Sequence, residues 1–124
     1  MKKKIKVSIF SGNRAEYGLL SPIIKKISQS NKISESIIIT GSHLNKKYGS
    51  TSKEIHNDKI KKIFKLKISN RNNNNSDFTP LSISEILQKV TKLINKIKPD
   101  IFIIYADRYE TFAAGIAASQ MGIP

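Results

Sequence analysis

The chain of 124 residues contains no cysteine, no tryptophan and only 2 histidines. Without cysteine there is no disulfide framework, no cysteine-ligated metal and no thiol nucleophile. Two histidines without clustered carboxylates also argue against a metal site. No run of about 18 apolar residues is present, which argues against a membrane-spanning helix. The basic start is followed by neither a long apolar segment nor a small-residue cleavage site, so we expect no secretory signal and a cytoplasmic location.

Acidic residues are also scarce, with 9 Asp and Glu against 22 Lys and Arg and a net charge of +13. Of the basic residues 19 are lysines and only 3 are arginines. Proteins that read phosphates or bases rely on arginine, whose planar fork binds bidentately. The few aromatic residues are not interleaved with the lysines, as base stacking would require. We therefore interpret the lysines as a solvated surface and keep nucleic-acid binding as an alternative function.

The remaining composition, 39% hydrophobic, is sufficient for the core of one domain. Short apolar or β-branched runs predict strands at 5–10, 35–40, 62–68 and 100–106. They alternate with patterns that predict helices at 15–30, 50–58, from Thr79 to Pro99, and at 111–121. This alternation predicts an α/β fold, a parallel Rossmann-like sheet with helices on both faces.

Several local signals predict where these elements begin and end. Pro22 favours a regular helix that begins near Ser21, with proline at its first position. Ser82 and Glu85 have the spacing of a capping box. The run 62–68 alternates between polar and apolar residues, which indicates a strand near an edge. Residues 123–124 follow Gly122 and indicate the first step into a further strand.

Three polar segments follow predicted strands, at 11–18 (SGNRAEYG), 41–44 (GSHL) and 107–110 (DRYE). Ligands of open parallel sheets bind outside the carboxyl ends of the strands, so we expect these segments to form one site. Two of the three arginines, Arg14 and Arg108, lie in them. Each favours either a bidentate grip on a diphosphate or carboxylate, or an ion pair with Glu16 or Glu110. The first segment matches neither a dinucleotide-binding nor a P-loop motif.

Asp107 directly follows an apolar strand. Such a carboxylate can be partly desolvated and serve as a general acid or base, or it can cap the following helix. His43 lies in a polar loop at the same edge of the predicted sheet and is interpreted either as a catalyst or as a surface residue.

In these segments the chain resembles the hydrolysing UDP-N-acetylglucosamine 2-epimerases of sialic-acid and legionaminic-acid synthesis. The resemblance rests on SGNRAEYG, on TGSHL followed by Tyr48-Gly49, and on Asp107-Arg108-x-Glu110 after KPDIFIIY. It runs in order over essentially the whole chain. Arg-Ala-Glu is typical of the hydrolysing branch, whereas the non-hydrolysing enzymes typically have Arg-Pro-Glu. The chain departs from the family at Ala106, where glycine is usual, and at Asn13, where serine or threonine is usual.

The resemblance implies a two-domain glycosyltransferase-B-like fold with a UDP-sugar bound between the domains. It implies no metal and no redox cofactor, and a homo-oligomer for the full-length protein. UDP would be eliminated with loss of the C2 proton, and water would add to give the mannose-configured sugar. Asp107 matches a catalytic acid or base of the family. The implied UDP-sugar-binding residues are Arg14, Glu16, His43, Arg108 and Glu110.

The resemblance covers only the first part of these enzymes. We therefore expect residues 1–124 to be an N-terminal domain that stops before its last strands and lacks the second domain, with negligible turnover alone. The alternative from another class is a small α/β binding or regulatory module. A receiver-like module requires paired acidic residues at the end of its first strand, and this chain has none there.

Overall fold

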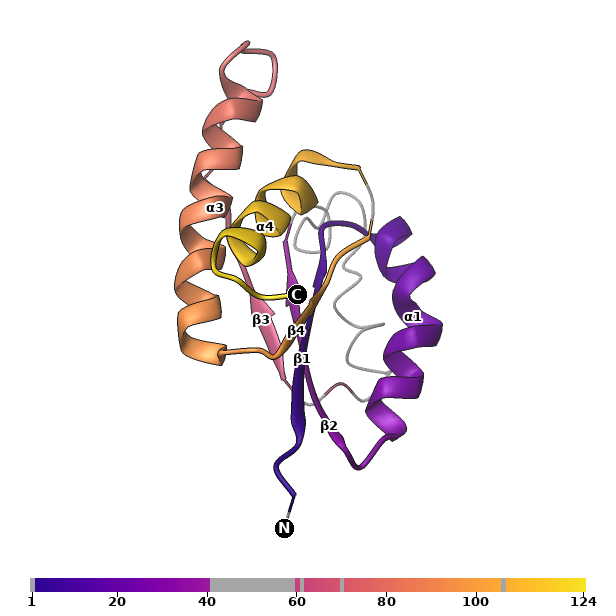
Figure 1. Cartoon of the computed structure of the whole chain (residues 1–124). Coiled ribbons are helices and arrows are strands. Elements are labelled where there is room, and N and C mark those ends of the chain that lie inside the picture. The colour runs from indigo at the N-terminus through magenta and orange to yellow at the C-terminus, as the bar shows by residue number, and fades with distance from the viewer. Residues whose placement is uncertain (1, 41–59, 61, 70, 106) are drawn as a thin grey trace.

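The computed structural model describes residues 2–40, 60, 62–69, 71–105 and 107–124. Four strands of these residues form a parallel sheet in the order β3-β2-β1-β4. Helix α1 covers one face of the sheet, and helices α3 and α4 cover the other (Figure 1). The predicted fold class is therefore confirmed. In chain order the elements are β1 (Ile5–Ser11), α1 (Arg14–Gln29), β2 (Ile33–Ile39), β3 (Ile63–Lys65), α3 (Phe78–Ile97), β4 (Ile101–Ile103) and α4 (Tyr109–Gln120).

Strand β2 contains three consecutive isoleucines, and its place in the middle of the fold explains them. Ile38 packs in the core under α3 and α4, whereas Ile37 and Ile39 pack in the core under α1. All three side chains are fully buried. Successive strand residues point to opposite faces, so a continuous apolar run is what a strand covered on both sides requires.

Helix α1 begins at Arg14, not near Ser21, and it runs through Pro22. The prediction that Pro22 takes the first helical position is therefore wrong. The turns before Pro22 are held by other contacts, because the Asn13 side chain caps the helix and Leu20 is buried against the sheet. Tertiary packing here outweighs the helix-breaking preference of proline.

Helix α3 begins at Phe78, four residues before Ser82, so the predicted capping box is also wrong. Ser82 is instead buried within the helix, and its hydroxyl has no hydrogen-bond partner among the described residues. Pro80 is tolerated because the first amides of a helix have no partner within the helix. The helix ends where Lys98 adopts a left-handed conformation, directly before Pro99, as the sequence predicts.

Glu85 ties α3 to the segment that precedes it. Its carboxylate accepts hydrogen bonds from the Ser69 amide, from Arg71 Nη1 and from Lys89 Nζ, each at 2.8 Å. Burial raises the pKa of Glu85, but the hydrogen bonds from Lys89, Ser69 and Arg71 outweigh it and lower the pKa to about 2.

Strand β4 is shorter than the predicted 100–106, and α4 begins at Tyr109 where we expected Thr111. On the side of β4 that faces away from β1, the Phe102 amide donates a hydrogen bond of 2.8 Å to the Pro124 carbonyl. Gly122, with φ of +72°, turns the chain after α4 and brings Pro124 alongside β4. Strand β3 lies at the edge of the sheet, as predicted. The helix predicted at 50–58 lies outside the described residues.

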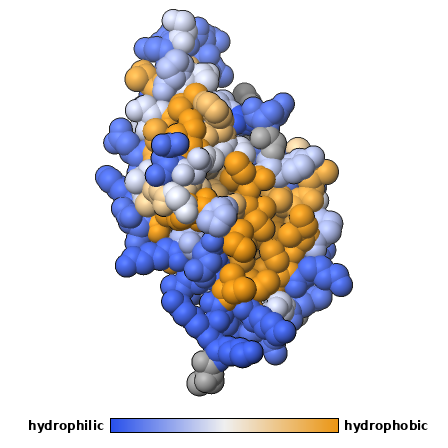
Figure 2. Space-filling model, viewed as in Figure 1, coloured by the Kyte–Doolittle hydropathy of each residue, from blue (hydrophilic) through white to orange (hydrophobic). Residues whose placement is uncertain are grey.

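An apolar patch faces the viewer in Figure 2, over the area between β4 and α1. Exposed apolar side chains of these two elements are Leu19 and Ile23 on α1 and Ile101 on β4, with 41–60% of each exposed. β4 is at the end of the strand order, so this patch borders an edge of the described sheet.

Candidate functional site

The candidate site lies where the strand order reverses. The chain passes from β1 to β2 and β3 on one side, and β4 then pairs with the other side of β1. The segments after β1 and β4 lead into α1 and α4, which cover opposite faces of the sheet (Figure 1). Such a switch point opens a crevice at the carboxyl ends of the two strands, which is where parallel sheets bind ligands.

Glu16 joins the two sides of this crevice. Its Oε2 accepts a hydrogen bond of 2.6 Å from the Gly12 amide, and its Oε1 accepts one of 3.0 Å from the Thr111 hydroxyl of α4. The Asn13 side chain in turn accepts a hydrogen bond of 2.9 Å from the Glu16 amide, so Asn13 caps α1 in the way that serine or threonine would. Only 3% of Glu16 is exposed. Its carboxylate therefore holds the segment after β1 against α4 through these two hydrogen bonds.

Glu110 holds Arg108 in a two-point pair. Arg108 Nε donates to Glu110 Oε2 at 3.0 Å, and Arg108 Nη2 donates to Glu110 Oε1 at 3.2 Å. Glu110 is 2% exposed, whereas 52% of the Arg108 side chain is exposed. The hydrogen bonds and the charge of Glu110 raise the pKa of Arg108. The ion pair considered for Arg108 is therefore present, and it also fixes a guanidinium at the surface of the crevice.

Gly12 lies against both buried carboxylates. A Cβ atom at this position would come within 2.9 Å of Glu110 Oε2 and 3.2 Å of Glu16 Oε2. Any side chain at Gly12 would therefore displace a carboxylate that is already hydrogen-bonded. This dependence on the absent side chain appears only once the two glutamates are located in the fold.

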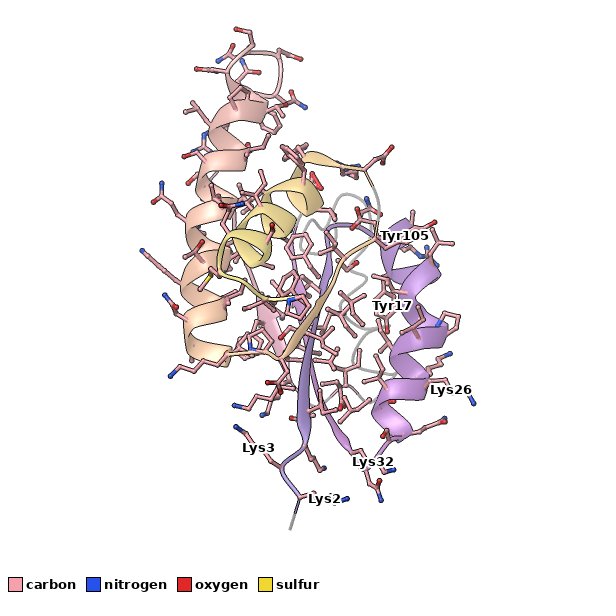
Figure 3. The ribbon with its side chains drawn as sticks, viewed as in Figure 1. Lys2, Lys3, Tyr17, Lys26, Lys32 and Tyr105 are labelled. Atoms are coloured by element: carbon pink, nitrogen blue, oxygen red, sulfur yellow. The ribbon has the colours of Figure 1, made fainter. Side chains whose placement is uncertain are left out.

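The crevice opens into a hollow of about 550 Å³ lined by residues from both sides of the switch point. Asp107 and Arg108 line it from the β4 side, and Asn13 and Glu16 line it from the β1 side. Tyr105, which the sequence did not single out, lies beside the start of α1 and is half exposed (Figure 3). An exposed aromatic ring beside charged side chains in one hollow is suited to contact a sugar or a base.

Asp107 is exposed and does not cap α4, since Arg108 is the N-cap residue and no side chain caps that helix. The capping alternative for Asp107 is therefore wrong. Arg14 is exposed at the first position of α1 and is not among the residues that line the hollow. Asp107, Arg108, Glu110 and Glu16 are thus brought together, and His43 lies outside the described residues.

Among the residues that the structure describes, no group of three His, Asp or Glu side chains is placed to hold a metal ion. Within the same residues, no helix combines the length and the apolar character needed to cross a membrane.

Known proteins resemble this chain over nearly its whole length. The family described as UDP-N-acetylglucosamine 2-epimerase matches residues 25–124. A UDP-N,N'-diacetylbacillosamine 2-epimerase (hydrolyzing) of Legionella pneumophila is 34% identical over 96% of this chain. A GDP/UDP-N,N'-diacetylbacillosamine 2-epimerase (hydrolyzing) of Campylobacter jejuni is 34% identical over 98%. The chain spans 31% of the length of each of these relatives.

Solved structures agree with the sequence relatives. The structure of a UDP-GlcNAc 2-epimerase from Neisseria meningitidis bound to UDP-GlcNAc superposes with a TM-score of 0.79 and 27% identity. It covers 97% of this chain, which corresponds to 31% of that protein. The similarity in sequence and in fold leads to one conclusion: this chain belongs to the UDP-N-acetylglucosamine 2-epimerase family.

Proposed function

We propose that this chain is the N-terminal part of a hydrolysing UDP-sugar 2-epimerase and that the hollow at the switch point receives the UDP-sugar. The observation that carries the proposal is the meeting of Asp107 and Arg108 with Asn13 and Glu16 around one open hollow. A carboxylate and a fixed guanidinium side by side are the groups that proton transfer and diphosphate departure require.

The proposed reaction is an elimination followed by hydration. A base removes the C2 proton, the C–H electron pair forms a C1–C2 double bond, and UDP leaves with the electrons of the C1–O bond. Water then supplies a hydroxyl to C1 and a proton returns to C2 on the opposite face. The products are UDP and N-acetylmannosamine, or the 2,4-diacetamido analogue.

Each residue has a proposed role in this reaction. Asp107, exposed at the hollow, moves a proton as acid or base. Arg108 places positive charge against the departing diphosphate, because both of its bonds to Glu110 involve one edge of the guanidinium and leave Nη1 for a ligand. Arg14 and His43 remain proposed contacts to the UDP-sugar.

Glu16 and Glu110 belong to the binding set that the family resemblance implies, and we propose an indirect role for them. Both carboxylates are buried and hydrogen-bonded within the protein. They would act on the substrate through Gly12 and Arg108, which they hold in place.

We also propose that residues 1–124 form an incomplete domain that has negligible turnover alone. Two observations support this. Pro124 already pairs with the Phe102 amide at the outer side of β4, where a further strand would continue the sheet. The apolar patch between β4 and α1 lies beside that edge and would be covered by such an addition.

The names of the two bacterial relatives support UDP-N,N'-diacetylbacillosamine as the substrate, with UDP-N-acetylglucosamine as the alternative. A place in legionaminic-acid or sialic-acid synthesis stays a prediction from the resemblance. A cytoplasmic location and a homo-oligomeric full-length protein stay predictions from the sequence.

The role of Arg108 is tested by release of UDP from either UDP-sugar in the complete gene product. Arg108→Ala is expected to lower kcat/KM by about tenfold or more, as loss of a charge-assisted contact would. Arg71→Ala is the matched control, because Arg71 also pairs with a largely buried glutamate, Glu85, at 2.8 Å. Equal activity of the two variants would contradict the assignment. Arg14→Ala in the same assay tests the second arginine, whose loss is expected to abolish UDP release.

A further inference from the structure

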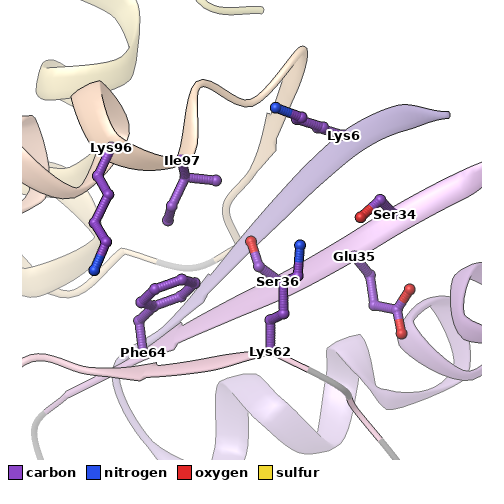
Figure 4. A pocket seen from close by; sticks show the side chains of 8 residues that line it. All are labelled: Lys6, Ser34, Glu35, Ser36, Lys62, Phe64, Lys96 and Ile97. Carbon is purple, nitrogen blue, oxygen red and sulfur yellow. The ribbon is translucent and has the colours of Figure 1, made fainter. Parts of the chain in front are cut away.

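A second pocket lies at the opposite edge of the sheet, at the amino ends of the strands. It has a volume of about 270 Å³. The strands β1, β2 and β3 and the last turn of α3 contribute to it (Figure 4). The residues that line it are Lys6, Ser34, Glu35, Ser36, Lys62, Phe64, Lys96 and Ile97.

Three ammonium groups surround this pocket. Lys6 reaches it from β1, Lys62 from the residue before β3, and Lys96 from α3 (Figure 4). Among the described residues, none of the three lies within ion-pair distance of a carboxylate. Like charges gathered around one cavity repel each other, so an anion in the pocket would relieve that repulsion.

The one carboxylate among the lining residues does not neutralise them. Glu35 pairs in register with Val7, whose side chain packs under α1, and so its side chain points to the α1 face. Ser36 points to the other face, where its hydroxyl lies 2.8 Å from that of Ser8. The Asp100 carboxylate at the same edge already accepts a hydrogen bond from the Lys6 amide.

The pocket also offers a hydroxyl and an apolar wall. Ser36 is 4% exposed, and when Ser8 donates within the pair, the Ser36 hydroxyl hydrogen is available to a ligand. The Phe64 ring and Ile97 form the apolar part of the wall. The Lys96 ammonium lies 5.9 Å from the centre of the Phe64 ring, a cation–π distance that keeps it over the pocket.

The negative end of the α3 dipole also attracts lysines, and it would explain one ammonium group here. It does not explain three, of which two come from outside the helix. We propose that this pocket binds a small phosphomonoester. Its phosphate, with a charge of about −2 at neutral pH, would lie among the three lysines and the Ser36 hydroxyl, and its carbon skeleton would rest against Phe64 and Ile97. The proposal is independent of the epimerase reaction, because the two sites lie at opposite edges of the sheet.

The test is a titration of the complete gene product with phenyl phosphate and with inorganic phosphate, measured by calorimetry and by amide shifts in NMR spectra. We expect saturable binding of phenyl phosphate, weaker binding of inorganic phosphate, and shifts centred on 34–36 and 62–64. Lys62→Gln and Lys96→Gln should each weaken binding of phenyl phosphate by roughly tenfold.

Lys26→Gln is the matched control, since Lys26 is an exposed helical lysine on the other face of the sheet (Figure 3). The melting temperature of each variant shows that a loss of binding is not a loss of folding. Equal weakening in all three variants would mean general attraction to positive charge and would overturn the proposal. Absence of saturable binding, or binding of heparin or duplex RNA without binding of phenyl phosphate, would also overturn it.

Discussion

Substitution of Gly12 by alanine tests the packing that joins the two halves of the site. The new Cβ atom would lie 2.9 Å from Glu110 Oε2 and 3.2 Å from Glu16 Oε2. Contacts this short force at least one carboxylate to move. Glu16 Oε2 would then lose its 2.6 Å bond to the Gly12 amide, or Glu110 Oε2 would lose its 3.0 Å bond to Arg108.

The expected cost follows from those losses. A hydrogen bond to a charged group contributes about 1.5–3 kcal/mol, and overpacking alone costs about 1–3 kcal/mol. Part of each bond is recovered when the carboxylate finds a new position, so we expect Gly12→Ala to lower the free energy of unfolding by about 2 kcal/mol. For a chain of this size that corresponds to a fall in melting temperature of roughly 6–10 °C.

Gly18→Ala is the matched control, because it makes the same chemical change inside α1. A Cβ atom at Gly18 meets nothing within 4 Å. Alanine at an exposed helical position is favoured over glycine by about 0.5–1 kcal/mol, so this variant should be more stable than the original chain. Urea and thermal unfolding followed by circular dichroism measure both variants. If Gly12→Ala proved as stable as Gly18→Ala, the packing of the two carboxylates around Gly12 would be refuted.

Three further predictions concern other contacts of the fold, one of them within the site. Because hydrogen bonds hold the pKa of Glu85 at about 2, below its ordinary value of 4.5, its stabilising effect is full above pH 4.5 and is lost as the pH falls toward 2. Glu85→Gln should therefore lower stability at pH 7 by on the order of 2 kcal/mol and flatten the acid limb of a stability–pH curve, and an unchanged limb would count against it. Thr111→Val should destabilise the chain by about 1–3 kcal/mol in urea titrations, because it leaves a buried Glu16 oxygen unpaired. The control Thr91→Val removes only a bond on the surface of α3 and should change stability by less than about 0.5 kcal/mol. Pro22→Ala should raise the melting temperature, since it restores an amide donor inside a continuous helix, and a fall would argue that α1 is broken there.

The arrangement of strands and helices could be predicted because periodicity reports burial directly. The run Ile37-Ile38-Ile39 indicates a strand covered on both faces, and both cores contain residues of that run. Most of the described lysines are exposed, as their interpretation as a solvated surface predicts. The edge position of β3 followed from its alternating pattern.

The residues at which helices begin were predicted less reliably, because contacts with the rest of the fold also determine where a helix begins. Pro22 is accommodated within α1, and Ser82 is buried in α3 where a cap was expected. Helix α1 begins earlier because Glu16 and Tyr17 of its first turn are buried. A preference of about 1 kcal/mol for a first position is small against the burial of such a turn. The first turn of α3 is largely exposed, and its described contact to the rest of the fold is that of Phe78, edge-on to the Tyr109 ring.

In the candidate site, too, the positions of residues along the chain could be predicted, whereas their long-range contacts could not. The position of Asp107 and Arg108 after a strand and of Glu16 after another placed them at one edge of the sheet. The hydrogen bond from Thr111 to Glu16 joins residues 95 positions apart, and no spacing in the sequence indicates it. The burial of Glu16 and Glu110, which makes them supports of the site, likewise depends on both helices packing around Gly12.

The central claim, that Asp107 transfers a proton in a UDP-sugar 2-epimerase, is tested most directly by UDP release from the complete gene product. UDP-N,N'-diacetylbacillosamine and UDP-N-acetylglucosamine are the substrates to compare. Asp107→Asn keeps the shape of the side chain, and we expect it to lower kcat by roughly 10²- to 10⁴-fold, as loss of a general acid or base does. Asp77→Asn, at the start of α3 and away from the hollow, should retain the original rate. Normal UDP release by Asp107→Asn, or no UDP release from either sugar by the original protein, would contradict the account.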